Sequence, residues 1–319
     1  MSKSLNIVFM GTPEFAVASL DALVKSRHKV IGVVTVPDKP ASRGLKLQSS
    51  AVKDYGVKNN LPVLQPEKLK NDSFLHELKA LNADLFVVVA FRMLPEVVWK
   101  MPKLGTINLH ASLLPNYRGA APINWAVING EKETGATTFF ITQEIDTGDI
   151  LLQERITISE EDNAGSIHDR LMEMGSNLLV KTVDAIADET VKAVKQNLQG
   201  EHKPAPKIFR ETCKINWNKP SVDVFNFVRG LSPYPGAWTE WTDSTGQKSI
   251  LKIYKTKKQD SVKVSLSKAI ADGDNRLFIG CADHALEILE LQPEGRKRMI
   301  VADFLRGIQS GAKTWDVSF

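Results

Sequence analysis

The chain has 319 residues, of which 43% are hydrophobic and 24% are charged, and its formal net charge is +4 at pH 7. This composition is ordinary for a globular protein, so it excludes a fibrous protein and large-scale disorder, and the length allows two domains. The apolar run near the N-terminus is too short for a secretory signal, and no later run is long enough to span a membrane. We therefore expect a cytoplasmic protein without a membrane partner.

The first half of the sequence alternates short apolar runs with helical patterns. Strands are expected at residues 5–10, 29–36, 84–90 and 106–110, and a helix at 13–25 begins with a proline. The third of these runs is almost continuously apolar, which is typical of a strand buried on both faces. The alternation predicts an α/β fold with a doubly wound, mostly parallel, Rossmann-like sheet, in which ligands bind at the carboxyl ends of the strands.

A long loop follows the second expected strand. Residues 37–48 are rich in proline and glycine and carry three positive charges, at Lys39, Arg43 and Lys46. Long loops in compact domains are often binding elements. A flexible basic connector is the alternative interpretation.

Two polar side chains stand at the end of the fourth expected strand. Asn108 and His110 are two residues apart, so they lie on the same face of that strand. An amide and an imidazole directed together commonly stabilise an oxyanion and transfer a proton. Asp146, in a loop between β-rich runs at 134–142 and 150–158, could orient the imidazole. The set predicts acyl-group transfer without a covalent nucleophile.

The C-terminal part has a different pattern. A helical stretch at 164–198 precedes a proline-containing linker, so we expect a first domain at 1–203, a linker at 204–208 and a second domain at 209–319. After a helix at 222–229, five strands and a closing helix are expected, at 237–242, 248–257, 262–266, 276–281, 285–291 and 300–309. Their number and length predict a small OB-like β-barrel, a fold that often binds nucleic acid.

Charge and cysteine content bear on the partners. Residues 201–319 carry 19 Lys and Arg against 14 Asp and Glu, a net charge of +5, whereas residues 1–200 carry 22 against 23. The positive excess favours an anionic partner for the C-terminal part, although solvated surface lysines explain it equally well. Cys213 and Cys281 are isolated, which fits neither a disulfide framework nor a metal site, and we expect no metal.

The segment Asn108-Leu109-His110-Ala111-Ser112-Leu113-Leu114-Pro115, with Asp146 downstream, resembles the catalytic motif of the formyltransferases that use 10-formyltetrahydrofolate. The loop that contains Arg43, and segments 233–238 and 291–299, resemble the branch of that family that formylates initiator methionyl-tRNA. The resemblance therefore extends over nearly the whole chain.

The resemblance implies that Asn108, His110 and Asp146 are catalytic, that 10-formyltetrahydrofolate is the co-substrate, and that initiator methionyl-tRNA is the partner. The sequence does not reveal the oligomeric state, but a partner as large as tRNA is compatible with a monomer, which is the state we expect. The resemblance further implies that the formyl-folate lies against Ser112, Leu113, Leu114, Pro115, Phe91 and Met93. Contacts with the aminoacyl substrate and the tRNA are expected from Arg43, Lys39, Lys46, Phe15, Lys257, Lys258, Arg296, Lys297 and Arg298. The sequence does not decide whether Arg92 reaches the folate.

Other functions are compatible with parts of this pattern. The same chemistry could serve a small amine, such as a nucleotide sugar or glycinamide ribonucleotide, or the hydrolysis of formyl-folate. A protein of this fold could also bind RNA without catalysis, although the intact set of Asn108, His110 and Asp146 argues against that interpretation.

Overall fold

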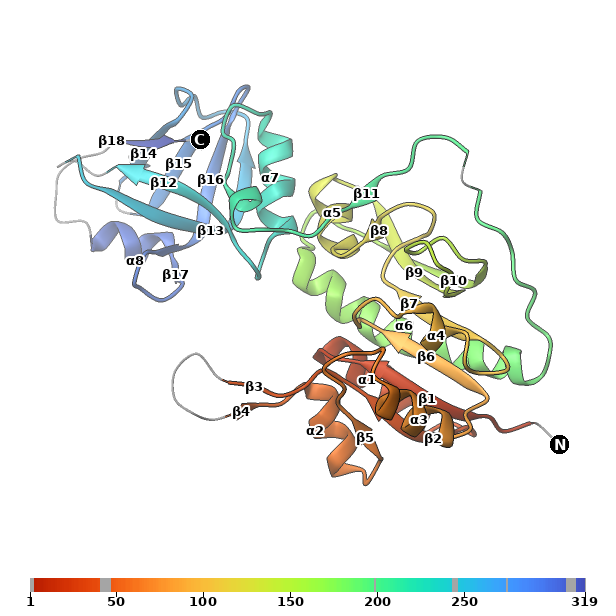
Figure 1. Ribbon diagram of the computed structural model, residues 1–319. Helices are drawn as coiled ribbons and strands as arrows, with labels where there is room; N and C mark the ends of the chain where they lie inside the picture. The colour runs from red at the N-terminus through yellow and green to blue at the C-terminus, as the bar shows by residue number, and fades with distance from the viewer. Residues whose placement is uncertain are drawn as a thin grey trace. The chain divides into compact units, whose positions relative to one another are not determined.

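The computed structural model describes residues 3–40, 47–197, 199–242, 246–273, 275–307 and 314–318, which form two compact units (Figure 1). The first unit comprises Met1–Gly119, Thr134–Ile156 and His168–Pro204, and the second comprises Ala120–Glu133, Thr157–Ile167 and Ala205–Phe319. Two segments that precede the expected linker thus pack with the C-terminal part of the chain. Arg43 and Lys46 lie outside the described residues.

A seven-stranded sheet with the order β10-β9-β7-β6-β1-β2-β5 forms the centre of the first unit. Neighbouring strands run parallel from β5 to β7, and β9 is antiparallel to β7. These strands are β1 (Asn6–Gly11), β2 (Lys29–Val34), β5 (Val63–Leu64), β6 (Leu85–Val89), β7 (Thr106–His110), β9 (Glu133–Phe140) and β10 (Ile150–Thr157). The mostly parallel, Rossmann-like sheet expected from the sequence is confirmed.

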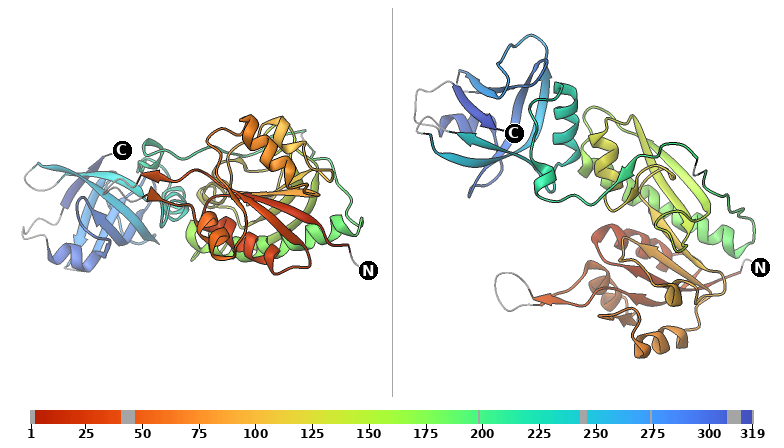
Figure 2. Two further views of the ribbon diagram at one scale, coloured as in Figure 1. Left: turned by 60° about the horizontal axis from the view of Figure 1, so that its bottom comes forward. Right: turned by 45° about the horizontal axis from the view of Figure 1, so that its top comes forward.

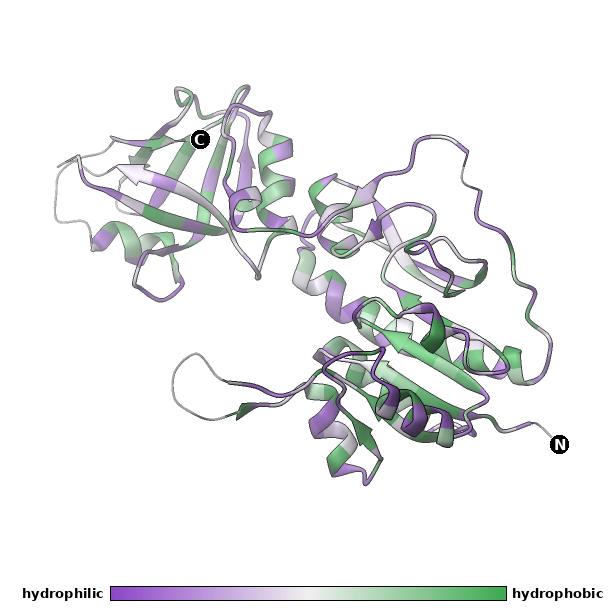
Figure 3. Ribbon diagram, viewed as in Figure 1, coloured by the Kyte–Doolittle hydropathy of each residue, from purple (hydrophilic) through white to green (hydrophobic). Residues whose placement is uncertain are grey.

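Helices cover both faces of this sheet (Figure 2). On one face, α3 (Asp72–Ala80) and α4 (Glu96–Trp99) contribute to an apolar cluster with Phe86 and Val88 of β6. On the other face, Gly175 of α6 (Ala164–Ala187) lies against Leu109 of β7. The remaining helices of this unit are α1 (Glu14–Val24) and α2 (Ala51–Lys58). Every residue of β6 is buried, which agrees with its uniformly hydrophobic sequence (Figure 3).

Helix α6 is shorter than expected. It ends at Ala187 instead of Leu198, and Glu189 follows with a left-handed φ of 56°. The chain then runs alongside β10, where the main chains of Val194 and Ile150 exchange two hydrogen bonds of 2.8 Å. The segment is therefore extended where a helix was expected, and at Val194 the hydrogen bonds with Ile150 replace helical ones.

A closed antiparallel barrel forms the centre of the second unit. Its sheet has the order β13-β12-β18-β14-β15-β16-β17, and the pairing of β13 with β16 closes six of these strands into a barrel. The strands are β12 (Ala237–Thr242), β13 (Lys248–Gln259), β14 (Lys268–Asp272), β15 (Arg276–Gly280), β16 (Ala285–Pro293), β17 (Met299–Ile300) and β18 (Thr314–Ser318). Trp217 is fully buried in its core and donates a hydrogen bond to Thr239.

The small barrel is confirmed, but one of its five expected strands is wrong. Residues 262–266 form no strand apart from an isolated bridge at Leu266, and β14 lies just after them. The last strand, β18, was not expected; it pairs with β12 and β14 and so supplies the sixth member of the barrel. Helices α5 (Pro122–Ile128), α7 (Ser221–Gly230) and α8 (Val301–Arg306) complete this unit.

The remaining regular elements of the described chain are short: β3 (Lys39–Pro40), β4 (Leu47–Gln48), β8 (Arg118–Gly119), β11 (Pro204–Ala205) and the 3-10 helix Glu211–Cys213. Among the helices in the described ranges, none combines the length and the apolar character that crossing a membrane requires.

Candidate active site

Asn108 and His110 lie at the carboxyl end of β7, where the sheet changes from parallel to antiparallel pairing. Asn108 stands opposite Val88 of β6 and Phe139 of β9. Because Val88 belongs to the cluster under α3 and α4, the side chain of Asn108 lies on that face of the sheet, and His110, two residues further, lies on the same face. His110 is buried and Asn108 is half-buried.

The imidazole of His110 is held by a main-chain carbonyl. Its Nε2 lies 2.8 Å from the carbonyl oxygen of Tyr117. Since a carbonyl only accepts hydrogen bonds, Nε2 must carry a proton and donate it. The other ring nitrogen, Nδ1, faces Oδ2 of Asp146 at 3.7 Å. That distance is too long for a hydrogen bond but close enough for the carboxylate to stabilise positive charge on the ring.

Asp146 occupies a constrained loop between β9 and β10. Its φ of 55° is in the left-handed region, which few residues other than glycine adopt. Its Oδ2 accepts a 2.9 Å hydrogen bond from the main-chain nitrogen of Gly119. A Cβ atom on Gly148 would lie 1.7 Å from the carbonyl oxygen of Phe140, so the loop passes the end of β9 at a distance that only glycine allows.

Two side chains that the sequence did not reveal support this loop: Gln196, which is buried and contacts it directly, and Arg118, which is half-buried and contacts Gln196. Gln196 donates hydrogen bonds to the carbonyl oxygens of Asp146 (2.9 Å) and Gly148 (2.8 Å), and Arg118 donates to the side-chain oxygen of Gln196. Burial lowers the pKa of the Arg118 guanidinium, and the carboxylates of Asp146 and Glu144 oppose this shift. Gln196 gave no signal because it falls in the segment expected to be helical. Arg118 stands directly before Gly119, whose main-chain nitrogen binds Asp146, but nothing in the sequence marks this position.

The segment Ser112 to Pro115, expected to hold the folate, is fixed by Thr137 of β9. The hydroxyl of Thr137 donates to the carbonyl oxygen of Ser112 (2.7 Å) and accepts from the main-chain nitrogen of Leu114 (3.1 Å). Gln153 of β10 donates to the same hydroxyl (2.9 Å) and to the carbonyl oxygen of Leu114 (3.0 Å). The segment therefore has a defined shape beside His110.

The residues after β6 differ in exposure. Phe91 is half-buried, whereas Met93 is 67% exposed. The guanidinium of Arg92 lies 5.6 Å from the centre of the Phe91 ring and donates hydrogen bonds to the carbonyl oxygens of Pro66 and Glu67.

Phe15 of α1, the expected apolar contact for the substrate, is buried, and the centre of its ring lies 5.2 Å from that of His168.

The basic residues expected to contact tRNA lie in separate places. Lys39 is exposed in β3 of the first unit; Lys257 and Lys258 are in β13, and Arg296, Lys297 and Arg298 lie between β16 and β17 of the second unit. Some of these charges already have acidic partners: Nζ of Lys258 is 2.8 Å from a carboxylate oxygen of Glu160, and Arg298 pairs with Glu290. Lys257, Arg296 and Lys297 are exposed.

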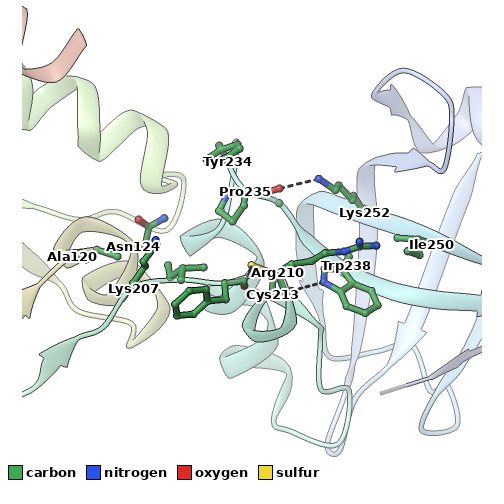
Figure 4. Close-up of a pocket in the computed structure, with 14 residues that line it drawn as sticks. Ala120, Asn124, Lys207, Arg210, Cys213, Tyr234, Pro235, Trp238, Ile250 and Lys252 are labelled. Atoms are coloured by element: carbon green, nitrogen blue, oxygen red, sulfur yellow. Dashed lines mark hydrogen bonds between the residues drawn. The ribbon is translucent and has the colours of Figure 1, made fainter. Parts of the chain in front are cut away.

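A cavity of about 540 Å³ in the second unit combines cationic and aromatic side chains (Figure 4). Among the residues that the structure describes, none in its lining has a carboxylate. The charged and aromatic residues of the lining are Lys207, Phe209, Arg210, Tyr234, Trp238 and Lys252. The guanidinium of Arg210 lies 6.0 Å from the ring centre of Trp238, and Lys252 donates to the carbonyl oxygen of Pro235. Neither Lys207 nor Arg210 could be predicted from the sequence, because neither belongs to a dense run of positive charge.

Comparisons with known proteins agree with these features. Residues 5–199 match a family model described as formyl transferase, and residues 207–309 match one described as formyl transferase, C-terminal domain. A protein named methionyl-tRNA formyltransferase from Bacteroides fragilis is 52% identical over 309 residues, which cover 96% of this chain and 95% of that protein. One of the same name from Parabacteroides distasonis is 53% identical over 317 residues, or 98% of each chain.

Two solved structures share the fold at low sequence identity. HypX from Aquifex aeolicus, in complex with tetrahydrofolic acid, has a TM-score of 0.65 at 20% identity, and the match covers 97% of this chain but 48% of that one. WlaRD, a sugar 3N-formyl transferase, has a TM-score of 0.62 at 21% identity and matches 92% of this chain and 99% of its own.

Proposed function

Since this chain belongs to the formyl transferase family, we propose that it transfers the formyl group of 10-formyltetrahydrofolate to the α-amino group of initiator methionyl-tRNA. The observation that carries the chemistry is the approach of His110 to Asp146 at 3.7 Å, beside Asn108 on the same face of β7. The relatives named methionyl-tRNA formyltransferase, which match this chain over nearly its full length, support the choice of substrate.

In the proposed reaction, the neutral amine attacks the formyl carbon directly. A bond forms between the amine nitrogen and that carbon, the carbonyl oxygen becomes an oxyanion, and the bond from carbon to N10 of the folate then breaks. The proton that the amine loses ends on N10. No acyl-enzyme forms, and the protein supplies oxyanion stabilisation and a proton path.

Each candidate catalytic residue has a distinct part in this scheme. The side-chain amide of Asn108 makes no hydrogen bond to any residue in the described ranges, which leaves it free to donate to the oxyanion. His110 uses its Nε2 proton on Tyr117, so Nδ1 is the nitrogen that can take and return a proton. Asp146 faces Nδ1 and stabilises the imidazolium that results. Donation from Nε2 to the oxyanion would require the bond to Tyr117 to be exchanged.

The segment Ser112 to Pro115 and the side chains of Phe91 and Met93 form the proposed folate site. A pterin is flat and has amide-like edges, so it needs an apolar slot bordered by main-chain donors and acceptors. The hydroxyl of Thr137 fixes this segment, which favours a pre-formed site. Arg92 is not included in the proposal, because main-chain carbonyls already engage its guanidinium.

The second unit is the proposed tRNA-binding domain. The described lining of its cavity has no carboxylate and brings Lys207, Arg210 and Lys252 close to three aromatic rings, a combination suited to phosphates and unpaired bases. Lys257 and the Arg296–Arg298 segment would add phosphate contacts. In the first unit, Lys39, Arg43 and Lys46 would contact the acceptor end, and Phe15 remains the proposed apolar contact.

Formyl-transfer assays test the proposal. The protein is incubated with 10-formyltetrahydrofolate and, in separate reactions, with initiator methionyl-tRNA, uncharged tRNA, free methionine or an amino sugar nucleotide. Formylation of methionyl-tRNA alone supports the proposal. Turnover of the small amines in preference to methionyl-tRNA would place this chain with the enzymes that formylate small amines, and formate release without an acceptor would indicate a hydrolase.

A further inference from the structure

We propose that Gln196 and Arg118 are positioning residues for Asp146. Together they hold the loop in the left-handed conformation that directs the carboxylate toward His110. The inference rests on the proposed catalytic role of Asp146 and adds two residues, from distant parts of the sequence, to the machinery of that site.

The conformation of Asp146 requires outside support. An aspartate with a φ of 55° is strained, and such strain persists only when the surrounding structure determines it. Gly148 anchors the far end of the loop against the end of β9, since a Cβ atom there would overlap the carbonyl oxygen of Phe140. The end nearer to Asp146 needs an anchor of its own.

The side chain of Gln196 provides that anchor. Both protons of its amide nitrogen are used, one on the carbonyl oxygen of Asp146 at 2.9 Å and one on that of Gly148 at 2.8 Å. These two carbonyls flank Thr147, so a single amide group fixes the main chain on both sides of that residue. Gln196 is only 8% exposed, and the paired main chains of Val194 and Ile150 fix its own position.

Arg118 closes the network around the carboxylate. Its guanidinium donates to the side-chain oxygen of Gln196, which orients that amide so that its nitrogen points at the loop. The next residue, Gly119, donates its main-chain nitrogen to Oδ2 of Asp146 at 2.9 Å. Gly119 therefore holds the carboxylate of Asp146 directly, and Arg118 holds its main-chain carbonyl through Gln196.

A purely structural role is the competing explanation, and a double-mutant cycle separates the two. If Gln196 acts through Asp146, Gln196→Met should lower kcat about 10- to 100-fold, because small misplacements of a catalytic group have effects of that size. KM for methionyl-tRNA and for formyl-folate should change less than about twofold. Once Asp146→Asn has removed the carboxylate, adding Gln196→Met should have almost no further effect, because coupled residues are not additive.

Two more variants complete the design. Arg118→Lys keeps a positive charge but loses the planar fork of the guanidinium, so it should lower kcat while the protein stays folded. This variant tests the positioning role even if Gln196→Met does not fold. Gln199→Met is the matched control, because it makes the same substitution three residues beyond Gln196, where the side chain is exposed. Its kcat should equal that of the unmodified protein. Thermal midpoints are measured for every variant.

The outcomes distinguish this inference from the proposed function. Near-normal turnover in Asp146→Asn would remove the catalytic role of Asp146 and, with it, the basis of the inference. If Asp146→Asn is inactive but Gln196→Met and Arg118→Lys keep normal kcat, the proposed function stands and the positioning role is refuted. Losses that multiply in the double variant would also refute it, because they would show that Gln196 acts independently of Asp146.

Discussion

Replacing Thr137 with valine removes a single hydroxyl on which the conformation of the Ser112 to Pro115 segment depends. Valine has nearly the same shape, so the change takes away hydrogen bonds without creating a cavity. The hydroxyl donates to the carbonyl oxygen of Ser112 and accepts from the main-chain nitrogen of Leu114 and from Gln153. Gln153 keeps its second partner, the carbonyl oxygen of Leu114, so two main-chain groups lose the bond that Thr137 supplied.

These contacts set the expected magnitude. A buried polar group left without a partner lowers the free energy of unfolding by about 1 to 3 kcal/mol, and the loss is smaller for a carbonyl oxygen than for a main-chain nitrogen. For the two groups together we expect a decrease of about 3 kcal/mol. For a domain of this size, that corresponds to a fall in the thermal midpoint of about 6 to 12 °C. KM for 10-formyltetrahydrofolate should rise, because the loosened segment must be ordered again when the ligand binds.

The measurements are thermal unfolding and steady-state kinetics with each substrate varied in turn. Thr190→Val is the matched control, since Thr190 is exposed and its hydroxyl donates one long hydrogen bond of 3.4 Å, to the carbonyl oxygen of Ala185. A midpoint within about 1 °C of the unmodified protein, together with an unchanged KM for formyl-folate, would show that Thr137 does not hold the segment.

Three other predictions follow from the site and the basic surface. Asn108→Ala, His110→Ala and Asp146→Asn should each lower kcat by about 10² to 10³ with little change in tRNA affinity, and normal turnover at saturating substrates in any one of them would remove that residue from the mechanism. Arg43→Ala should lower kcat/KM for methionyl-tRNA, and Arg43→Lys should restore only part of it, because an ammonium lacks the planar fork of a guanidinium; full activity in Arg43→Ala would make the loop a connector. Replacing Lys257 and Lys258 with glutamine should make the slope of log affinity against log salt shallower by about one and not two, because Lys258 already pairs with Glu160; an unchanged slope would exclude both residues from phosphate contacts.

The first unit could largely be predicted from local sequence signals. Apolar runs and their spacing identified β1, β2, β6 and β7 within two residues at each end. These strands are buried on both faces, so their sequences carry a strong and simple pattern. The placement of Asn108 and His110 on one face followed from the period of a strand alone.

What the sequence could not reveal depends on contacts between distant residues. Gln196 lies in an extended segment that owes its conformation to β10, and its propensity favours a helix instead. The strand β18 was missed because its role appears only once β12 and β14 are placed beside it. The link between Arg118 and Gln196 joins residues 78 positions apart, and neither residue type indicates such a pairing by itself.

The division of the second unit into separate stretches of sequence constrains how the chain can fold during synthesis. Helix α5 emerges from the ribosome long before α7, although Asn124 of α5 donates a hydrogen bond to the carbonyl oxygen of Gly230, and Ile128 packs against that glycine. Arg229 likewise donates to the carbonyl oxygens of Ser159 and Asp162. These early segments cannot pack until the later part of the second unit has been synthesised, and the barrel cannot close before β18 has been synthesised. A ribosome-bound chain that ends near residue 203 should therefore expose the apolar side of α5, which makes it a natural binding site for chaperones until the rest of the protein arrives.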